Sequence, residues 1–180
     1  SSHAACELNE VSKALMDHMP NTHKGGQPVN DSAQFVQDMI TLHQDVHQQL
    51  REAIAGLDSA ALNWTPGPDT SSLAIIVVHS LGAEAEMLRN LLGIPTQRLR
   101  DEEFARHDYQ PAELETLIAE AEADWRELAP RLGDSELRTA IPRPNKPEPQ
   151  TGLFWLMRNY GHMREHLAQI WLTKQVYGQP

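Results

Sequence analysis

Residues 31–57 have the sequence DSAQFVQDMITLHQDVHQQLREAIAGL, in which apolar side chains recur at alternating intervals of three and four positions. This spacing places them on one face of an α-helix, and such a face packs against neighbouring helices that run nearly parallel or antiparallel. Asp31 is suited to cap the helix, and Gln34 can reach back to it in a capping box. The pattern predicts a long helix with one buried stripe: Val36, Met39, His43, Val46, Leu50, Ala53 and Leu57.

Three further segments carry helical patterns. Residues 72–92 predict a second helix, 111–133 a third and 151–177 a fourth, each bounded by Gly, Pro or a capping side chain. Long connections follow the second and third helices. The sequence therefore predicts an all-α fold, a four-helix bundle that occupies residues 31–180. Residues 1–30 are expected to form an N-terminal tail that contains one short helix at most.

Composition narrows the class of protein. The 180 residues suit one domain, and 25 Asp and Glu against 15 Lys and Arg give a net charge of −10. An acidic surface repels phosphate backbones, which disfavours a nucleic-acid partner. The single cysteine, Cys6, cannot form an intramolecular disulfide. No apolar run approaches the roughly 18 residues of a membrane span, and no signal-peptide pattern is visible, so a cytoplasmic protein without a membrane partner is expected.

The fourth helix carries the most informative polar residues. His162 and His166 are four positions apart, so their Cβ atoms lie about 6 Å from each other on one helix face and both imidazoles can bind one metal ion. Asn159 and Gln169 share this face and are candidates for a pocket lining or for support of the imidazoles. If this polar strip is buried, it needs partners, because each unpaired polar group costs about 1–3 kcal/mol.

Other histidines bear on this interpretation. His43 and His47 form a second pair at the same spacing, so the spacing alone is weak evidence. By its place on the buried stripe His43 is a packed core residue, and it is also a candidate for the pocket lining. His79 lies in the most apolar part of the second helix. Three histidines from two helices form a half-shell with open positions, which is typical of catalytic metal centres. Glu84 and Glu86 are expected on a solvated face.

On two groups of residues the chain resembles the DinB-like superfamily, also called DinB/YfiT-like metalloenzymes. They are LNWTPGP at 62–68 with SLAIIVVH at 72–79, and HMREHLAQI at 162–170. The resemblance covers about residues 31–177. It implies an up-down-down-up bundle, a homodimer and one divalent metal ion, reported as Ni, Zn, Fe or Mn. It also implies the metal ligands, which in this chain are His79, His162 and His166.

The resemblance leaves the activity open. It implies a metal-dependent enzyme that activates a thiol or water, either a thiol S-transferase with a low-molecular-weight thiol as cosubstrate or a hydrolase of small molecules. The alternative is a non-catalytic dimeric bundle that binds a metal or a ligand. His162, Glu165 and His166 also match the H-x-x-E-H pattern of inverzincin proteases. We disfavour that class, because a helix places Glu165 about 100° from His166, off the ligand face.

Overall fold

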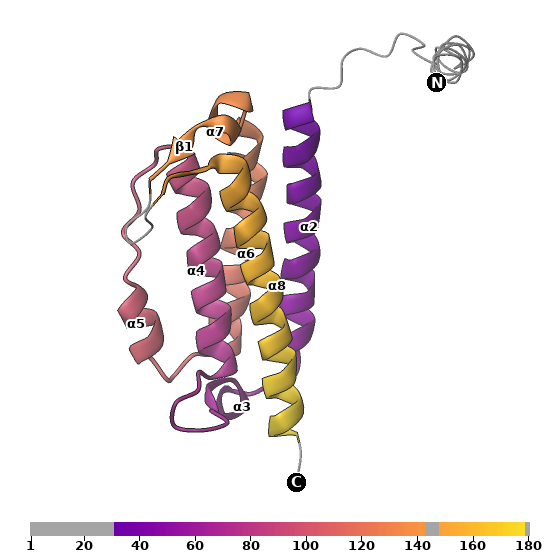
Figure 1. Ribbon diagram of the computed structural model, residues 1–180. Coiled ribbons are helices and arrows are strands. Elements are labelled where there is room, and N and C mark those ends of the chain that lie inside the picture. Colours follow the sequence, from indigo (N-terminus) through magenta and orange to yellow (C-terminus); the bar gives the residue numbers. More distant parts are fainter. Residues whose placement is uncertain (1–30, 143–147, 179–180) are drawn as a thin grey trace, which may run out of the picture.

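The computed structural model describes residues 31–142 and 148–178, and most of them are helical. The predicted tail, 1–30, lies outside the described residues. Four long helices lie side by side (Figure 1): α2 (Asp31–Ile54), α4 (Leu73–Leu91), α6 (Pro111–Leu128) and α8 (Gly152–Tyr177). The all-α prediction is confirmed.

Short elements occupy the connections. They are α3 (Ser59–Asn63), α5 (Arg100–Ala105), the 3-10 helix η1 (Ala129–Arg131), α7 (Asp134–Arg138), and the two-residue strands β1 (Ala140–Ile141) and β2 (Gln150–Thr151). The strands pair antiparallel, with Ala140 opposite Thr151. The sequence patterns predicted neither α5 nor this pair, because segments this short carry too little periodicity.

Capping side chains and glycines define the ends of α4 and α8. The Ser72 hydroxyl caps α4 by accepting from the Ile75 amide at 3.3 Å, and the Thr151 hydroxyl caps α8 by accepting from the Phe154 amide at 3.2 Å. Gly93 follows α4 with a φ of +66°, a conformation that favours glycine. Gly152 is needed for a close approach, since a Cβ there would lie 2.1 Å from the Glu136 carbonyl oxygen.

The helix order brings α4 and α8 together. These two helices pack against each other. The helix α2 packs against α8 and α6, and α6 packs against α4 and α2. The N-termini of α2 and α8 lie at the end of the molecule that carries α7, whereas α4 and α6 end there (Figure 1). Because α4 and α8 run antiparallel, the first half of α4 lies beside the second half of α8.

The core lies between the four long helices. Its fully buried side chains come from every one of them and include Leu50, Leu88, Leu114, Ile118, Leu156 and Ile170. Burying a side chain of this size contributes about 1.5–3 kcal/mol, so the packing of the stripes stabilises helices that would be marginal alone. Among the described residues, no helix combines the length and the apolarity that a membrane crossing requires.

Candidate metal centre

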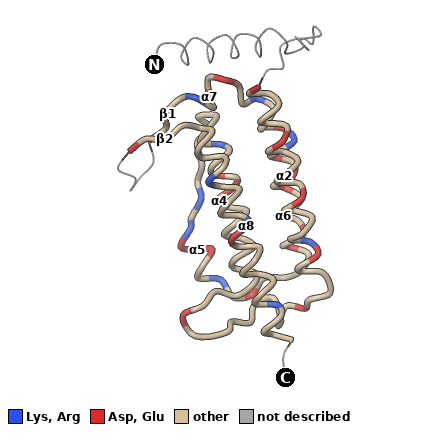
Figure 2. Tube along the Cα trace, turned by 45° about the vertical axis from the view of Figure 1, so that its right-hand side comes forward, with Lys and Arg blue, Asp and Glu red and all other residues tan. Residues whose placement is uncertain are grey.

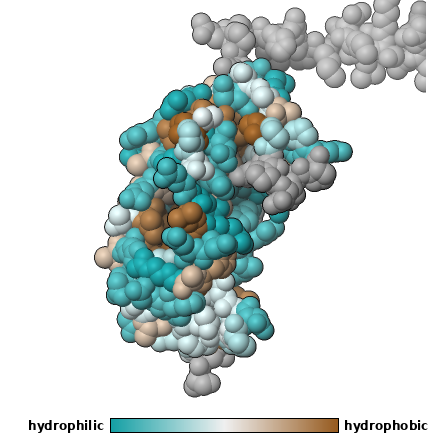
Figure 3. Space-filling view, turned by 90° about the vertical axis from the view of Figure 1, so that its left-hand side faces the viewer, coloured by the Kyte–Doolittle hydropathy of each residue, from teal (hydrophilic) through white to brown (hydrophobic). Residues whose placement is uncertain are grey.

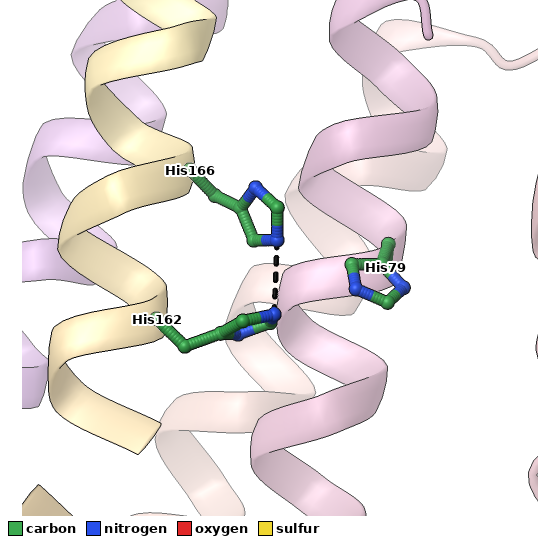
Figure 4. Close-up of side chains that lie close together, drawn as sticks. All are labelled: His79, His162 and His166. Carbon is green, nitrogen blue, oxygen red and sulfur yellow. Dashed lines mark hydrogen bonds between the residues drawn. The ribbon is translucent and has the colours of Figure 1, made fainter. Parts of the chain in front are cut away.

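Three histidines converge between α4 and α8. His79 projects from α4, and His162 and His166 project from α8 toward it (Figure 4). One ring nitrogen of each lies within 4.8 Å of the others. The Nε2 atoms of His162 and His166 are 2.9 Å apart, and the His79 ring centre lies 5.3 Å and 5.2 Å from theirs. The structure thus brings together the three residues that the sequence proposed as ligands.

Gln169 sets the proton position on His166. The Nδ1 atom of His166 lies 2.7 Å from the Gln169 side-chain oxygen. Since an amide oxygen only accepts hydrogen bonds, Nδ1 carries the proton and Nε2 keeps its lone pair. That lone pair faces His162. Gln169 therefore has the supporting position expected for it, because metal-binding histidines usually donate their other ring N–H to such an acceptor.

The surroundings keep two of the imidazoles neutral. Burial lowers the pKa of His79 to about 4, helped by the positive charges of Arg98 and His166 and opposed by Glu103. Burial also lowers the pKa of His162 to about 4, together with the charges of His166, His79 and Arg158. At pH 7 both rings are uncharged. The neutral ring is the form that binds a metal ion.

The connection after α4 holds His79 in place. An Arg98 Nη2 group donates to the His79 Nδ1 atom at 3.0 Å and to the His79 carbonyl oxygen at 3.1 Å. Arg98 is itself bound by Glu103 at 2.7 Å and 2.8 Å, and a Glu103 oxygen lies 3.4 Å from the same Nδ1 atom. Glu103 can therefore accept the Nδ1 proton when Nε2 is engaged. Sequence analysis missed both residues, since no motif or spacing links them to His79.

Two hollows meet at the histidines. The larger, about 590 Å³, is lined by His79, His166 and a mixture of apolar and polar side chains that expose mainly apolar surface. The smaller, about 440 Å³, is lined by His79, His162 and a more polar set. Seen from the side that carries α5, the surface shows apolar patches bordered by hydrophilic residues (Figure 3).

The donor set fits a divalent ion. Three imidazole nitrogens suit Zn, Ni and Fe(II), and three protein ligands leave positions for water or substrate. The hollows on either side provide the room for it.

The family model of the DinB superfamily matches residues 42–170. The chain belongs to the DinB superfamily. This confirms the resemblance seen in the sequence. The fold of this DinB-superfamily chain is also similar to the crystal structure of a conserved protein from Enterococcus faecalis, with a TM-score of 0.66 and 16% identity over 78% of this chain and 95% of that one. At this identity the likeness concerns the fold alone. No curated protein matches the chain in sequence.

Asn159 lies beside the cluster of His79, His162 and His166. Its side chain is buried and lines the smaller hollow with His162. Neither the Asn159 Oδ1 atom nor the His162 Nδ1 atom has a hydrogen-bond partner among the described residues. The two unpartnered atoms belong to residues three positions apart on α8, and the Asn159 oxygen is a candidate acceptor when Nδ1 carries a proton.

A second histidine pair is buried between α2 and α4. His43 and His47 both contact Glu84, with the His43 Nδ1 atom 2.7 Å and the His47 Nε2 atom 3.0 Å from its oxygens. The Trp125 indole N–H also donates to Glu84, and the Trp125 ring stacks on His43 with ring centres 3.9 Å apart. His43 is thus placed in this cluster, and it does not line either hollow beside His79.

Glu84 is buried in the core, with 1% of its side chain exposed. The expectation that it lies on a solvated face is therefore wrong. The signal for this was present in the sequence: Glu84 continues the stripe of Val77, Leu81 and Leu88 on the inner face of α4.

Charge and hydrogen bonds keep Glu84 ionised. Burial alone would raise the pKa of Glu84, but the charge and hydrogen bond of His43 and those of His47 outweigh it and bring the pKa to about 2. Together the two imidazoles and the carboxylate also form a group of metal-binding type. However, three N–H donors already bind the carboxylate, and the cluster is closed to solvent, which indicates a network that ties α2, α4 and α6 together.

Proposed function

We propose that this DinB-superfamily chain is a divalent-metal-dependent enzyme that acts on small molecules, with His79, His162 and His166 as the metal ligands. The observation that carries the proposal is that three converging imidazoles, two of them held neutral at pH 7, lie where two hollows meet. Zn, Ni and Fe(II) are the candidate ions.

The chain's own residues supply the arrangement. Gln169 orients His166, and the Arg98–Glu103 pair orients His79. The apolar hollow limits access of water to a bound molecule. When bound, the ion supplies a positive charge that brings a water, or the thiol of a low-molecular-weight cosubstrate, to its ionised form near neutral pH. The reaction is then transfer of the thiol to an electrophile or hydrolysis of an activated bond.

The up-down-down-up topology and a homodimer belong to the same proposal. The topology is supported by the directions of the four long helices in Figure 1. The dimer is supported by apolar side chains that α8 exposes near its start, Leu153, Phe154 and Met157. A cytoplasmic location remains a prediction from the sequence.

Metal content tests the ligand assignment. Protein purified without chelator is incubated with Zn, Ni or Fe(II), desalted and measured by plasma mass spectrometry, beside a His162→Ala/His166→Ala variant. His107→Ala is the control, because His107 is exposed and outside the cluster. We expect about one ion per chain in the wild type and the control and none in the double variant. Absence of stoichiometric metal from all three would overturn the proposal.

Turnover distinguishes the two reaction types. A thiol transferase conjugates a low-molecular-weight thiol to monochlorobimane, whereas a hydrolase cleaves activated esters or amides without a thiol. Either activity is expected to disappear in the double variant. If the metal-loaded wild type turns over neither class of probe, the non-catalytic bundle replaces the enzyme as the better interpretation.

A further inference from the structure

The two hollows beside the histidines differ in chemical character. The one next to His166 exposes mainly apolar surface, from Ile76, Phe104, Leu172 and Val176, although Arg100 also lines it. The one next to His162 is lined by three arginines, Arg98, Arg100 and Arg158. Any molecule that reaches the histidines therefore has a mainly apolar surface on one side and a cationic surface on the other, with Arg100 between the two.

The cationic surface stands out in an acidic chain. The net charge of the chain is −10, yet three guanidinium groups surround one hollow of about 440 Å³. Arg98 comes from the connection between α4 and α5, and Arg100 is the first residue of α5, where Figure 2 shows basic residues directly before the acidic ones. The third comes from α8. Residues from two separate parts of the chain thus place positive charge at the same position.

Two of the three charges have no counter-ion among the residues that the structure describes. Arg98 is bound by Glu103 and lies 3.3 Å from Glu86, which also lines the hollow. The Arg100 guanidinium lies over the Phe104 ring, 4.7 Å from its centre. Arg158 forms no ion pair with any described residue. Arg98 is therefore neutralised by its carboxylates, whereas Arg100 and Arg158 remain available to an external anion.

Arg158 lies beside the histidines. It lines the same hollow as His79 and His162. It lies four residues before His162, one turn earlier on α8. The cationic hollow and the histidine cluster consequently form one continuous site.

We propose that the hollow lined by Arg100 and Arg158 binds an anionic group of the substrate, a carboxylate or a phosphate, and that these two arginines determine specificity for it. The apolar hollow on the other side of His79 receives the uncharged part of the same molecule or of its co-reactant. Guanidinium groups suit this task because their planar N–H groups match both oxygens of a carboxylate or phosphate. The inference names the substrate class for the proposed function and rests on it.

Binding of a small dianion tests the inference without any catalysis. Succinate and inorganic phosphate are titrated into the full chain at constant ionic strength, and their dissociation constants are measured by NMR, with neutral succinamide as the reference. Constant ionic strength is needed because salt screens exposed charges. The titrations use the wild type, Arg158→Gln, Arg158→Lys, Arg100→Gln/Arg158→Gln and, as a matched control, Arg131→Gln. Arg131 is exposed and does not line this hollow.

We expect succinate and phosphate to bind and succinamide not to bind. Arg158→Gln should weaken binding of both anions about 10- to 100-fold, as expected for hydrogen bonds to charged groups. Arg158→Lys should lose less affinity, and the double variant should bind the anions no better than succinamide. Equal binding of succinate and succinamide, or the same dissociation constant for Arg158→Gln and Arg131→Gln, would overturn the inference.

A repeat in the His162→Ala/His166→Ala background separates this inference from the proposed function. That variant lacks two of the proposed ligands, so an anion can no longer bind through a metal ion. Binding that persists there and still depends on Arg158 supports the cationic subsite even if no enzymatic activity is found. Binding that is lost there, and is unaffected by Arg158→Gln in the metal-loaded chain, would assign the anion to the metal ion and refute the role of the arginines.

Discussion

The Nε2 atoms of His162 and His166 face each other at 2.9 Å, one helical turn apart on α8. Because Gln169 accepts the Nδ1 proton of His166, the proton between the two Nε2 atoms belongs to His162. A metal ion needs both Nε2 lone pairs, so the proton of His162 has to move to its Nδ1 atom. That Nδ1 atom is buried without a hydrogen-bond partner among the described residues, and His162 lines the same hollow as Asn159. The residues around the pair therefore decide how readily it binds a metal.

Removing His79 should abolish metal binding and leave the bundle folded. We expect His79→Ala to contain no stoichiometric metal, since two imidazoles alone leave too few ligands. The His79 side chain is only partly buried, and the Arg98–Glu103 pair does not depend on it. The loss of stability should be about 1 kcal/mol, a fall of about 2–4 °C in the melting temperature. Plasma mass spectrometry and circular dichroism measure both effects. Full metal content in this variant would show that His79 is not a ligand.

Gln169→Ala should weaken zinc binding about 10- to 100-fold, as is typical when the outer partner of a metal-bound histidine is removed. The loss of the acceptor leaves the His166 ring free to change its tautomer and orientation. Competition with a chromophoric chelator measures the dissociation constant. Gln169→Glu keeps an acceptor and should retain most of the affinity. Gln175→Ala, on the exposed side of α8, is the control, and an equal effect in both alanine variants would contradict the supporting role.

Asn159→Ala should also weaken zinc binding, by about the same factor. Its side-chain oxygen is an unpartnered acceptor in the same hollow as His162, and metal binding at Nε2 moves the His162 proton to Nδ1. Asn159→Asp offers a stronger acceptor and should bind zinc at least as tightly as the wild type. The same chelator competition checks this. Unchanged zinc affinity in Asn159→Ala would show that Asn159 does not support His162.

Glu84→Gln should destabilise the fold without changing the metal content. The amide offers two N–H groups to side chains that already donate, His43, His47 and Trp125. Breaking a buried charged network from one side costs about 3–5 kcal/mol. Urea denaturation measures the loss. Glu120→Gln, an exposed position on α6, should change stability little. A Glu84→Gln protein as stable as this control would show that the network contributes nothing.

The stability of the wild type should fall in acid through Glu84. Its pKa is about 2 in the folded chain and 4.5 in an unperturbed glutamate, so the unfolded state takes up the proton first as the pH decreases. The contribution is complete above about pH 4.5 and is lost between pH 4.5 and 2. Its size is about 3 kcal/mol, since one pKa unit corresponds to about 1.4 kcal/mol. Urea titrations from pH 6 to pH 2 should show the difference between wild type and Glu84→Gln shrinking across this range. A difference that is constant with pH would contradict the assignment.

The helices and the histidine pair of α8 were predictable because their signals are local. The stripe within 31–57 and the four-residue spacing of His162 and His166 follow from the helical period alone. The place of Glu84 on the inner stripe of α4 is also visible in the sequence, whereas the expectation of a solvated face rests on acidic residues late in a helix being usually exposed. His79 became a ligand candidate through its apolar surroundings and the family resemblance.

The sequence by itself determined which long segments are helical, which face of each is apolar, and that two histidines lie one turn apart on the same face of the last helix. The tertiary structure alone decided that Arg98 and Glu103 reach His79, that Glu84 meets His43 and His47, and that Arg100 and Arg158 line one hollow. The physical reason is the separation along the sequence of the residues that come into contact. Helical periodicity relates residues three or four positions apart, whereas these contacts depend on how antiparallel helices and their connections pack, which no local spacing specifies.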